Sequence, residues 1–335
     1  MSWLKKDPLQ IIAFQSYGTD THFYLRGRTL QDESIYLGQK GFFRLLINSW
    51  KRLESDEVKH VGINIKLPNG KILKAKSDDH GYFKVEATLN GLKDLANSEG
   101  WLVCEVSYND VNIKRNIQNN NSFPAEILIP STKTEFGVAS DIDDTILHTG
   151  VVSTLKWRVL YNTIFKSAKM RLPLEGAAEF CHLLHLGQSG ESTNPIFYVS
   201  HSPWNLYRYL EFFLRQNNFP KGPILLRNFS DILKKRTPNE KPQKHKEILN
   251  LLKTYPDLPF ILIGDSGEND VDIYIEIAAQ FPDRIKAIYL RSVKHKKKIL
   301  RVKGLLESYK TTPALLVETS AQAIAHAREN GFIER

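Results

Sequence analysis

The stretch that decides the fold is residues 136–150, FGVASDIDDTILHTG. Its first residues, 136–139, form a short apolar run of the kind that makes a buried central strand. The run then breaks into polar residues, and the ones that matter are Asp141, Asp143, Asp144 and Thr145. In open α/β sheets, ligands bind at the carboxyl ends of the strands, so we expect these side chains at the mouth of a site. Clustered carboxylates in a low dielectric repel one another unless a cation or selective protonation relieves them. A bound divalent metal ion is the simplest way to offset this repulsion. The alternative interpretation is that the acidic residues cap the following helix.

Composition is ordinary for a soluble globular protein. The chain has 335 residues, enough for two domains, with 41% hydrophobic and 25% charged residues. Cys104 and Cys181 offer neither a disulfide framework nor a metal-binding spacing. No stretch approaches the roughly 20 apolar residues that span a bilayer, and the first residues lack the apolar core of a signal peptide. We therefore expect a cytoplasmic protein without a transmembrane segment, associated at most peripherally with a membrane.

The formal net charge of +9 indicates an anionic partner, which could be a phospholipid surface, nucleic acid or a phosphorylated small molecule. The most concentrated basic run is 294–298 (Lys-His-Lys-Lys-Lys), continued by Arg301 and Lys303. The ordinary interpretation of such a run is a solvated helix face. Charge alone does not choose among the partners.

Residues 1–133 have the pattern of a β-rich, β-sandwich-like domain. The Asn69-Gly70 pair stands between two alternating runs, 61–67 and 71–76, which is a strong hairpin signal. The pattern Asp-x-His-Gly-Tyr-Phe at 78–83 resembles small transthyretin-like or immunoglobulin-like sandwiches that serve as accessory modules. We also expect a helix over 42–53. Because no catalytic constellation occurs in this half, the sequence favours a binding or positioning role for it.

From residue 134 onward, apolar runs alternate with helical patterns, which is typical of a parallel sheet covered by helices. The expected strands are 136–140, 195–200, 260–264, 286–290 and 314–317. The expected helices include 175–186, 204–217, 243–253 and 320–330. The sequence therefore predicts an α/β, Rossmann-like domain over 134–335.

The run Asp141-Ile-Asp143-Asp144-Thr145 resembles the DxDxT motif of the haloacid dehalogenase (HAD) superfamily, in its phosphatase branch. The resemblance implies a HAD-like fold. It also implies that Asp141 attacks phosphorus to form an aspartyl-phosphate. By the same resemblance, Asp143 protonates the leaving oxygen and then activates the hydrolytic water.

Two further elements stand where a HAD phosphatase needs them. The strand at 196–199 ends at Ser200, whose hydroxyl would bond a phosphoryl oxygen. A lysine before the last motif would neutralise the phosphate and hold the nucleophile ionised, and Lys244 and Lys246 are both candidates. We favour Lys246, because the family named below places its lysine directly after a histidine, here His245.

The strand at 260–263 ends in GDSGEND, residues 264–270, the GDxxxxD form of the metal-binding HAD motif. Mg²⁺ prefers octahedral oxygen coordination with few protein carboxylates. The expected ligands are Asp141, the backbone carbonyl of Asp143, and Asp265. Asp270 either binds the metal or orients a bound water.

Five stretches together look like one family, the actin-patch-associated phosphatidate phosphatases. They are 140–150, 198–206 (YVSHSPWNL), 219–227 (FPKGPILLR), 245–246 (HK) and 263–274. The resemblance is strong over about 136–290 and implies Mg²⁺-dependent hydrolysis of phosphatidate to diacylglycerol and phosphate. Because the chain lacks the long tail and Pro-rich motifs of fungal members, it is similar to a compact, bacterial-type member.

Residues 147–171 leave room only for a small cap, which would keep the site open to bulky or membrane-bound substrates. Within it, residues 157–169 combine aromatic and basic side chains, a pattern that suits either an anionic membrane surface or the protein core. The residues expected to bind substrate are Thr145, His201, Trp204 and Arg227. The expected partner is phosphatidate at a membrane surface, with no nucleic acid.

Two alternatives remain open. The same chemistry could act on a soluble or macromolecular phosphate ester, because HAD phosphatases differ mainly in their caps. The chain could also be a non-catalytic module that binds anionic lipid or nucleic acid, with a vestigial acid cluster.

Overall fold

The computed structural model describes residues 8–31, 57–109, 115–142, 175–190, 194–227, 240–266, 269–292, 296–309 and 311–334. The chain divides into two compact units. The first contains Met1–Ser131 with Asn205–Tyr209, and the second contains Thr132–Trp204 with Leu210–Arg335. The helix predicted over 42–53 lies outside the described residues.

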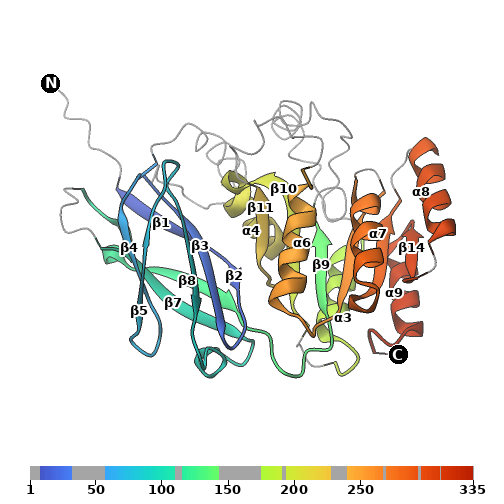
Figure 1. Cartoon of the computed structure of the whole chain (residues 1–335), viewed down its shortest axis with the longest axis horizontal. Helices are drawn as coiled ribbons and strands as arrows, with labels where there is room; N and C mark the ends of the chain where they lie inside the picture. Colours follow the sequence, from blue (N-terminus) through green and yellow to red (C-terminus); the bar gives the residue numbers. More distant parts are fainter. Residues whose placement is uncertain are drawn as a thin grey trace. The chain divides into compact units, whose positions relative to one another are not determined.

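The first unit contains two β-sheets (Figure 1). The smaller sheet is antiparallel and contains, in spatial order, β1 (Leu9–Phe14), β3 (His22–Gln31) and β6 (Tyr82–Thr88). The larger sheet contains, in spatial order, β2 (Ser16–Tyr17), β8 (Phe123–Leu128), β7 (Trp101–Tyr108), β4 (Gly62–Lys66) and β5 (Ile72–Lys76). Its strands pair antiparallel, except that β2 runs parallel to β8.

The core of this unit lies between the two sheets, because alternate residues of each strand point to the same side. Phe23 and Leu25 of β3 belong to the same buried cluster as Ile63 and Ile65 of β4. The hairpin predicted around Asn-Gly is confirmed, since β4 and β5 pair across a turn in which Gly70 adopts a φ of +84°. The predicted β-sandwich is therefore confirmed.

The second unit contains a six-stranded sheet in which every neighbouring pair is parallel. The strands, in spatial order, are β11 (Ile224–Arg227), β10 (Ile196–Pro203), β9 (Gly137–Asp141), β12 (Phe260–Asp265), β13 (Ile285–Arg291) and β14 (Ala314–Val317). All residues of β9 and β12 are buried. Such continuous burial is characteristic of strands at the centre of a sheet covered by helices.

The helices of the described chain are α3 (Ala177–Leu186), α4 (Tyr207–Gln216), α6 (Gln243–Thr254), α7 (Asp270–Gln280), α8 (Lys296–Ser308) and α9 (Ser320–Glu329). In Figure 1, α6 and α7 lie in front of the sheet. Helices α3 and α9 both pack on Tyr289 of β13, through the ring of Phe180 and the imidazole of His326. The predicted α/β sheet with helices is confirmed. Within the described residues, no helix combines the length and apolar character needed to cross a bilayer.

Candidate active site

The register of three central strands brings the predicted motifs to one edge of the sheet. Strand β9 lies between β10 and β12, and its last residue, Asp141, pairs with Val199 of β10. On the other side, Ser140 pairs with Ile263, so β12 ends at Asp265 beside the same position. Because the strands are parallel, both aspartates stand at carboxyl ends, where α/β sheets bind ligands.

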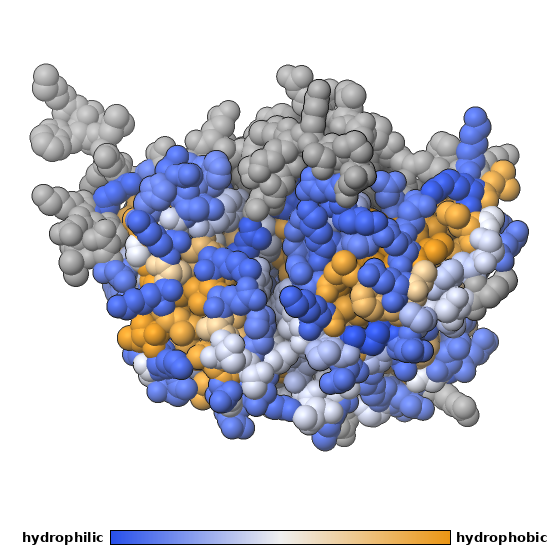
Figure 2. All heavy atoms as spheres, viewed as in Figure 1, coloured by the Kyte–Doolittle hydropathy of each residue, from blue (hydrophilic) through white to orange (hydrophobic). Residues whose placement is uncertain are grey.

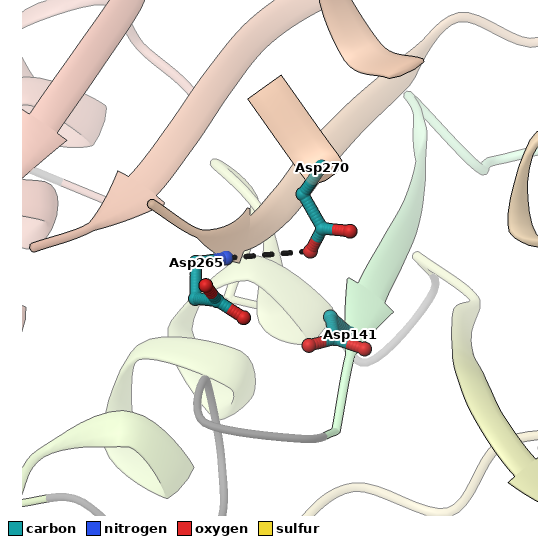
Figure 3. Close-up of side chains that lie close together, drawn as sticks. All are labelled: Asp141, Asp265 and Asp270. Atoms are coloured by element: carbon teal, nitrogen blue, oxygen red, sulfur yellow. Dashed lines mark hydrogen bonds between the residues drawn. The ribbon is translucent and has the colours of Figure 1, made fainter. Parts of the chain in front are cut away.

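Three carboxylates meet at this edge. Asp141, Asp265 and Asp270 are fully buried, and one carboxylate oxygen from each lies within 4.8 Å of the other two (Figure 3). Asp270 is the first residue of α7, and its Oδ2 accepts a hydrogen bond from the backbone amide of Asp265 at 3.4 Å. The cluster therefore joins two strands and the start of a helix.

Lys244 of α6 is the cation of this cluster. Its Nζ lies 2.9 Å from Asp141 Oδ1 and donates a hydrogen bond to Asp270 Oδ1 at 2.5 Å. The three side chains of these ion pairs are completely excluded from solvent. A buried charge requires compensation, and here the ammonium lies between two carboxylates.

The lysine favoured from the sequence, Lys246, lies elsewhere. Its side chain is 44% exposed and its Nζ forms an ion pair with Glu240 at 2.8 Å. Residues two apart on an α-helix point about 200° away from each other, so only one of the two lysines can face the sheet. We correct the expectation accordingly: Lys244 is the lysine that contacts the aspartates.

A second polar group on α6 faces α7. His245 is buried, and its Nε2 lies 3.6 Å from Oε1 of Glu276, which also forms an ion pair with Lys241. Burial lowers the pKa of His245 below its ordinary value, an effect that Glu276 opposes. The hydrogen bond from Lys241, followed by the charge of His245, lowers the pKa of Glu276. These contacts link α6 to α7, the helices that carry Lys244 and Asp270.

Close packing at the end of β12 fixes the position of Asp270. A Cβ added to Gly264 would lie 2.5 Å from Asp270 Oδ2 and 2.8 Å from the ring of Tyr274, so this position needs a residue without a side chain. The Tyr274 hydroxyl donates to the carbonyl of Ile263 at 3.0 Å. Burial, and next the carboxylate of Asp270, raise the pKa of Tyr274 well above its ordinary value, so the phenol stays neutral. No role was predicted for Tyr274 from the sequence, although its place in a family motif was a signal.

The remaining predicted site residues lie around this edge or outside the described chain. Ser200 is buried one position beyond Val199, and its Oγ accepts a hydrogen bond from the amide of Ser202 at 2.9 Å. Trp204 is buried, whereas His201 of β10 and Arg227 at the end of β11 are partly exposed. Asp143, Thr145 and the cap at 147–171 lie outside the described residues.

The donor set fits a hard divalent cation. Three carboxylates and one ammonium give the four described side chains a formal charge of −2, which one divalent cation would neutralise. Carboxylate oxygens are the ligands that Mg²⁺ and similar ions prefer. Burial makes neutralisation more valuable, because uncompensated charge in a low dielectric is strongly destabilising.

Comparison with known proteins shows which family this part of the chain is similar to. Residues 136–292 match the family model of the phosphatidate phosphatase APP1 catalytic domain. The segment is therefore similar to the catalytic domains of that family. The APP1 match includes the whole described cluster, namely Asp141, Lys244, Asp265 and Asp270. The β-sandwich strands lie outside the match.

Two curated proteins are similar to about half of this chain. One is phosphatidate phosphatase APP1 of Saccharomyces cerevisiae, 36% identical over 176 residues, which are 51% of this chain and 28% of the yeast protein. The other is an uncharacterized protein of Schizosaccharomyces pombe, 32% identical over 160 residues, or 47% of this chain and 25% of that protein. The chain thus spans about a quarter of the length of these relatives.

A solved structure of Bacteroides thetaiotamicron EndoBT-3987 with its Man5GlcNAc product overlaps 84% of this chain and 77% of its own. Its sequence identity is 7% and its TM-score is 0.21, too low to relate the two folds.

Proposed function

We propose that this protein is a Mg²⁺-dependent phosphatidate phosphatase that releases phosphate and diacylglycerol through an aspartyl-phosphate on Asp141. The family of the catalytic domain supports the substrate, because the yeast relative is named for this activity. The observation that carries the chemistry is the position of Lys244, held between Asp141 and Asp270 in a buried cluster of three aspartates.

Asp141 is the proposed nucleophile. The ammonium of Lys244, 2.9 Å away, favours the ionised carboxylate that can attack phosphorus. As the bond from a carboxylate oxygen to phosphorus forms, the bond from phosphorus to the glycerol oxygen breaks. The leaving oxygen takes its proton from Asp143, which we assign to this role from the family motif.

The second step returns the enzyme to its starting state. Asp143 accepts a proton from a water molecule, whose oxygen attacks the phosphorus of the aspartyl-phosphate. The bond between phosphorus and Asp141 breaks, and inorganic phosphate leaves. Lys244 remains beside Asp141 in both steps and neutralises charge on the phosphoryl oxygens.

Asp141 and Asp265, together with the backbone carbonyl of Asp143, would hold Mg²⁺. When bound, this ion supplies charge neutralisation for the phosphoryl group and orients it toward Asp141. Both carboxylate oxygens of Asp270 accept hydrogen bonds, one from Lys244 and one from the Asp265 amide. We therefore assign Asp270 to orienting its neighbours rather than to direct coordination.

Ser200 is proposed to bind a phosphoryl oxygen. The amide of Ser202 donates to its Oγ and so orients the hydroxyl at the carboxyl end of β10. His201, Trp204 and Arg227, from the same part of the sheet, are proposed to contact the rest of the substrate, as is Thr145.

The test is phosphate release from phosphatidate in mixed micelles, with Mg²⁺ and with a chelator, beside a soluble chromogenic phosphate ester. We expect Mg²⁺-dependent release from the lipid that disappears in Asp141→Asn. Turnover of the soluble ester alone would retain the chemistry and contradict the lipid substrate. Absence of turnover on both substrates would favour a non-catalytic lipid-binding module.

A further inference from the structure

The outer face of α8 exposes an apolar side chain among basic ones. Leu300 is 70% exposed, more than the other exposed large hydrophobic residues of the described chain, Ile72 at 52% and Val103 at 47%. Lys297 and Lys303, one helical turn to either side of it, are both exposed. In Figure 2, apolar side chains are visible among hydrophilic ones over this helix.

Leu300 is not needed to pack α8 against the sheet. Val302 is fully buried on the opposite side of the helix, where Ile299 and Leu306 are partly buried. The inner face of α8 is therefore buried without Leu300, and its outer face combines an exposed apolar side chain with basic ones. Of the basic residues there, Arg301 is neutralised by an ion pair with Asp272, whereas the described residues bring no carboxylate within ion-pair distance of Lys297 or Lys303.

The charge of α8 opposes the helix dipole. Its sequence begins Lys-Lys-Lys, and its first turn contains no acidic residue. Cations near a helix N-terminus interact unfavourably with the helix dipole. An anionic surface close to this end would relieve the repulsion, so the helix is electrostatically complementary to such a surface.

The topology places this end of α8 at the edge of the sheet that holds the active site. Strands β13 and β14 are parallel neighbours, and α8 lies between them in sequence. A helix that connects parallel neighbours runs back against the strand direction, so it begins at their carboxyl ends. Asp141 and Asp265 stand at the carboxyl ends of strands in the same sheet.

From these observations we infer that the outer face of α8, formed by Lys297, Leu300 and Lys303, is the surface through which the catalytic unit binds an anionic phospholipid bilayer. The apolar side chain enters the interface while the two ammonium groups contact lipid phosphates. The inference deepens the proposed function and rests on it, because it names the surface that brings the catalytic edge to a lipid substrate.

A second exposed apolar residue provides the matched control. Ile72 of β5 also lies among exposed lysines, Lys74 and Lys76. Strand β5 is at the edge of its sheet, where lysines commonly prevent pairing with another chain. Its lysines thus have a structural explanation, and Ile72→Glu changes an exposed apolar residue to an acid outside α8.

The experiment measures binding of the full chain to vesicles of phosphatidylcholine with phosphatidylglycerol, and to vesicles of phosphatidylcholine alone. Phosphatidylglycerol is anionic but is not the proposed substrate, so binding is measured independently of turnover. We expect binding to the anionic vesicles that weakens with added salt. Leu300→Glu and Lys303→Glu should each lower the partition coefficient between anionic vesicles and water at least about five-fold. This fold-change corresponds to about 1 kcal/mol, the contribution of one basic residue near an anionic surface.

Ile72→Glu should leave vesicle binding unchanged, and hydrolysis of a soluble phosphate ester should be unchanged in all three variants. Equal losses for Ile72→Glu and Leu300→Glu, or undiminished binding of Leu300→Glu, would overturn the inference. So would a preference for double-stranded DNA over anionic vesicles that Lys303→Glu abolishes. If the natural protein binds vesicles but hydrolyses no phosphate ester, the catalytic proposal fails and the membrane surface stands.

Discussion

Exchanging each of two lysines on α6 for methionine tests the assignment of the active-site cation. Lys244 and Lys246 belong to one helix and differ in environment: the first is fully buried between two carboxylates, and the second is 44% exposed beside one. Methionine retains the length and helix propensity of lysine and removes only the charge and its hydrogen bonds. The two variants are therefore matched in every respect except position.

The structure sets different magnitudes for the two changes. Lys244→Met leaves Asp141 and Asp270 as buried carboxylates that have lost their shared cation, and breaking a buried pair in this way destabilises by about 3–5 kcal/mol. Removing a preorganised electrostatic group from an active site also lowers kcat by about 10²–10³. Lys246→Met removes an exposed ion pair, which contributes about 0–1 kcal/mol.

The assays are urea unfolding in a chelator and phosphate release with saturating Mg²⁺. We expect a large loss of both stability and turnover in Lys244→Met, and near-normal values in Lys246→Met. Equal losses of turnover in the two variants, or a loss confined to Lys246→Met, would refute the assignment of Lys244.

Three further predictions concern backbone packing, pH and thiol reactivity. Gly264→Ala should weaken Mg²⁺ binding and turnover because its Cβ would displace Asp270. In the control, Gly304→Ala, the added Cβ would meet nothing within 4 Å, so Mg²⁺ binding and turnover should be unchanged and the melting temperature slightly higher. Burial lowers the pKa of His326 below 6.5, so the unfolded chain binds the proton more readily than the folded chain. The urea midpoint should therefore fall as pH drops below about 6.5. The dependence of the midpoint on pH should be weaker in His326→Gln, and an unchanged dependence would contradict the prediction. Burial raises the pKa of Cys104 and of Cys181 to about 12, so a thiol-specific reagent at pH 8 should modify neither cysteine before urea unfolds the chain, and rapid labelling of the folded protein would count against this.

The central sheet was predictable because its strands are continuous apolar runs that end abruptly in aspartates. Asp141 and Asp265 end neighbouring parallel strands, so the pattern of each strand was enough to place both carboxylates at one edge. The structure adds their separation and their burial, which depend on register and on packing between elements. Neither quantity can be obtained from the pattern of a single strand.

The choice between Lys244 and Lys246 shows where sequence patterns lose resolution. The sequence predicted the helix that carries both, but the face that packs on the sheet depends on the exact phase of the helix. Only the contacts of Lys244 with Asp141 and Asp270 fix that phase. An expectation based on the neighbouring histidine selected the lysine on the exposed face.

Strand β11 and helix α7 were among the elements not predicted. Strand β11 has only four residues, too few for a period to be recognised. Helix α7 begins with Asp270, and the acids in its first turn were interpreted as the end of a metal-binding motif. The acidic residues at the start of α7 carry a chemical pattern that hides the helical one.

The most direct test of the proposed mechanism is to identify the phosphorylated residue. The protein is mixed with phosphatidate and Mg²⁺, quenched in acid and treated with borohydride, which reduces an aspartyl-phosphate to homoserine that peptide mass spectrometry can locate. We predict homoserine at position 141, which requires both substrate and Mg²⁺ and is absent in Asp141→Asn. Turnover of phosphatidate with no modification at this position, or with modification of another residue, would contradict the assignment of Asp141 as the nucleophile.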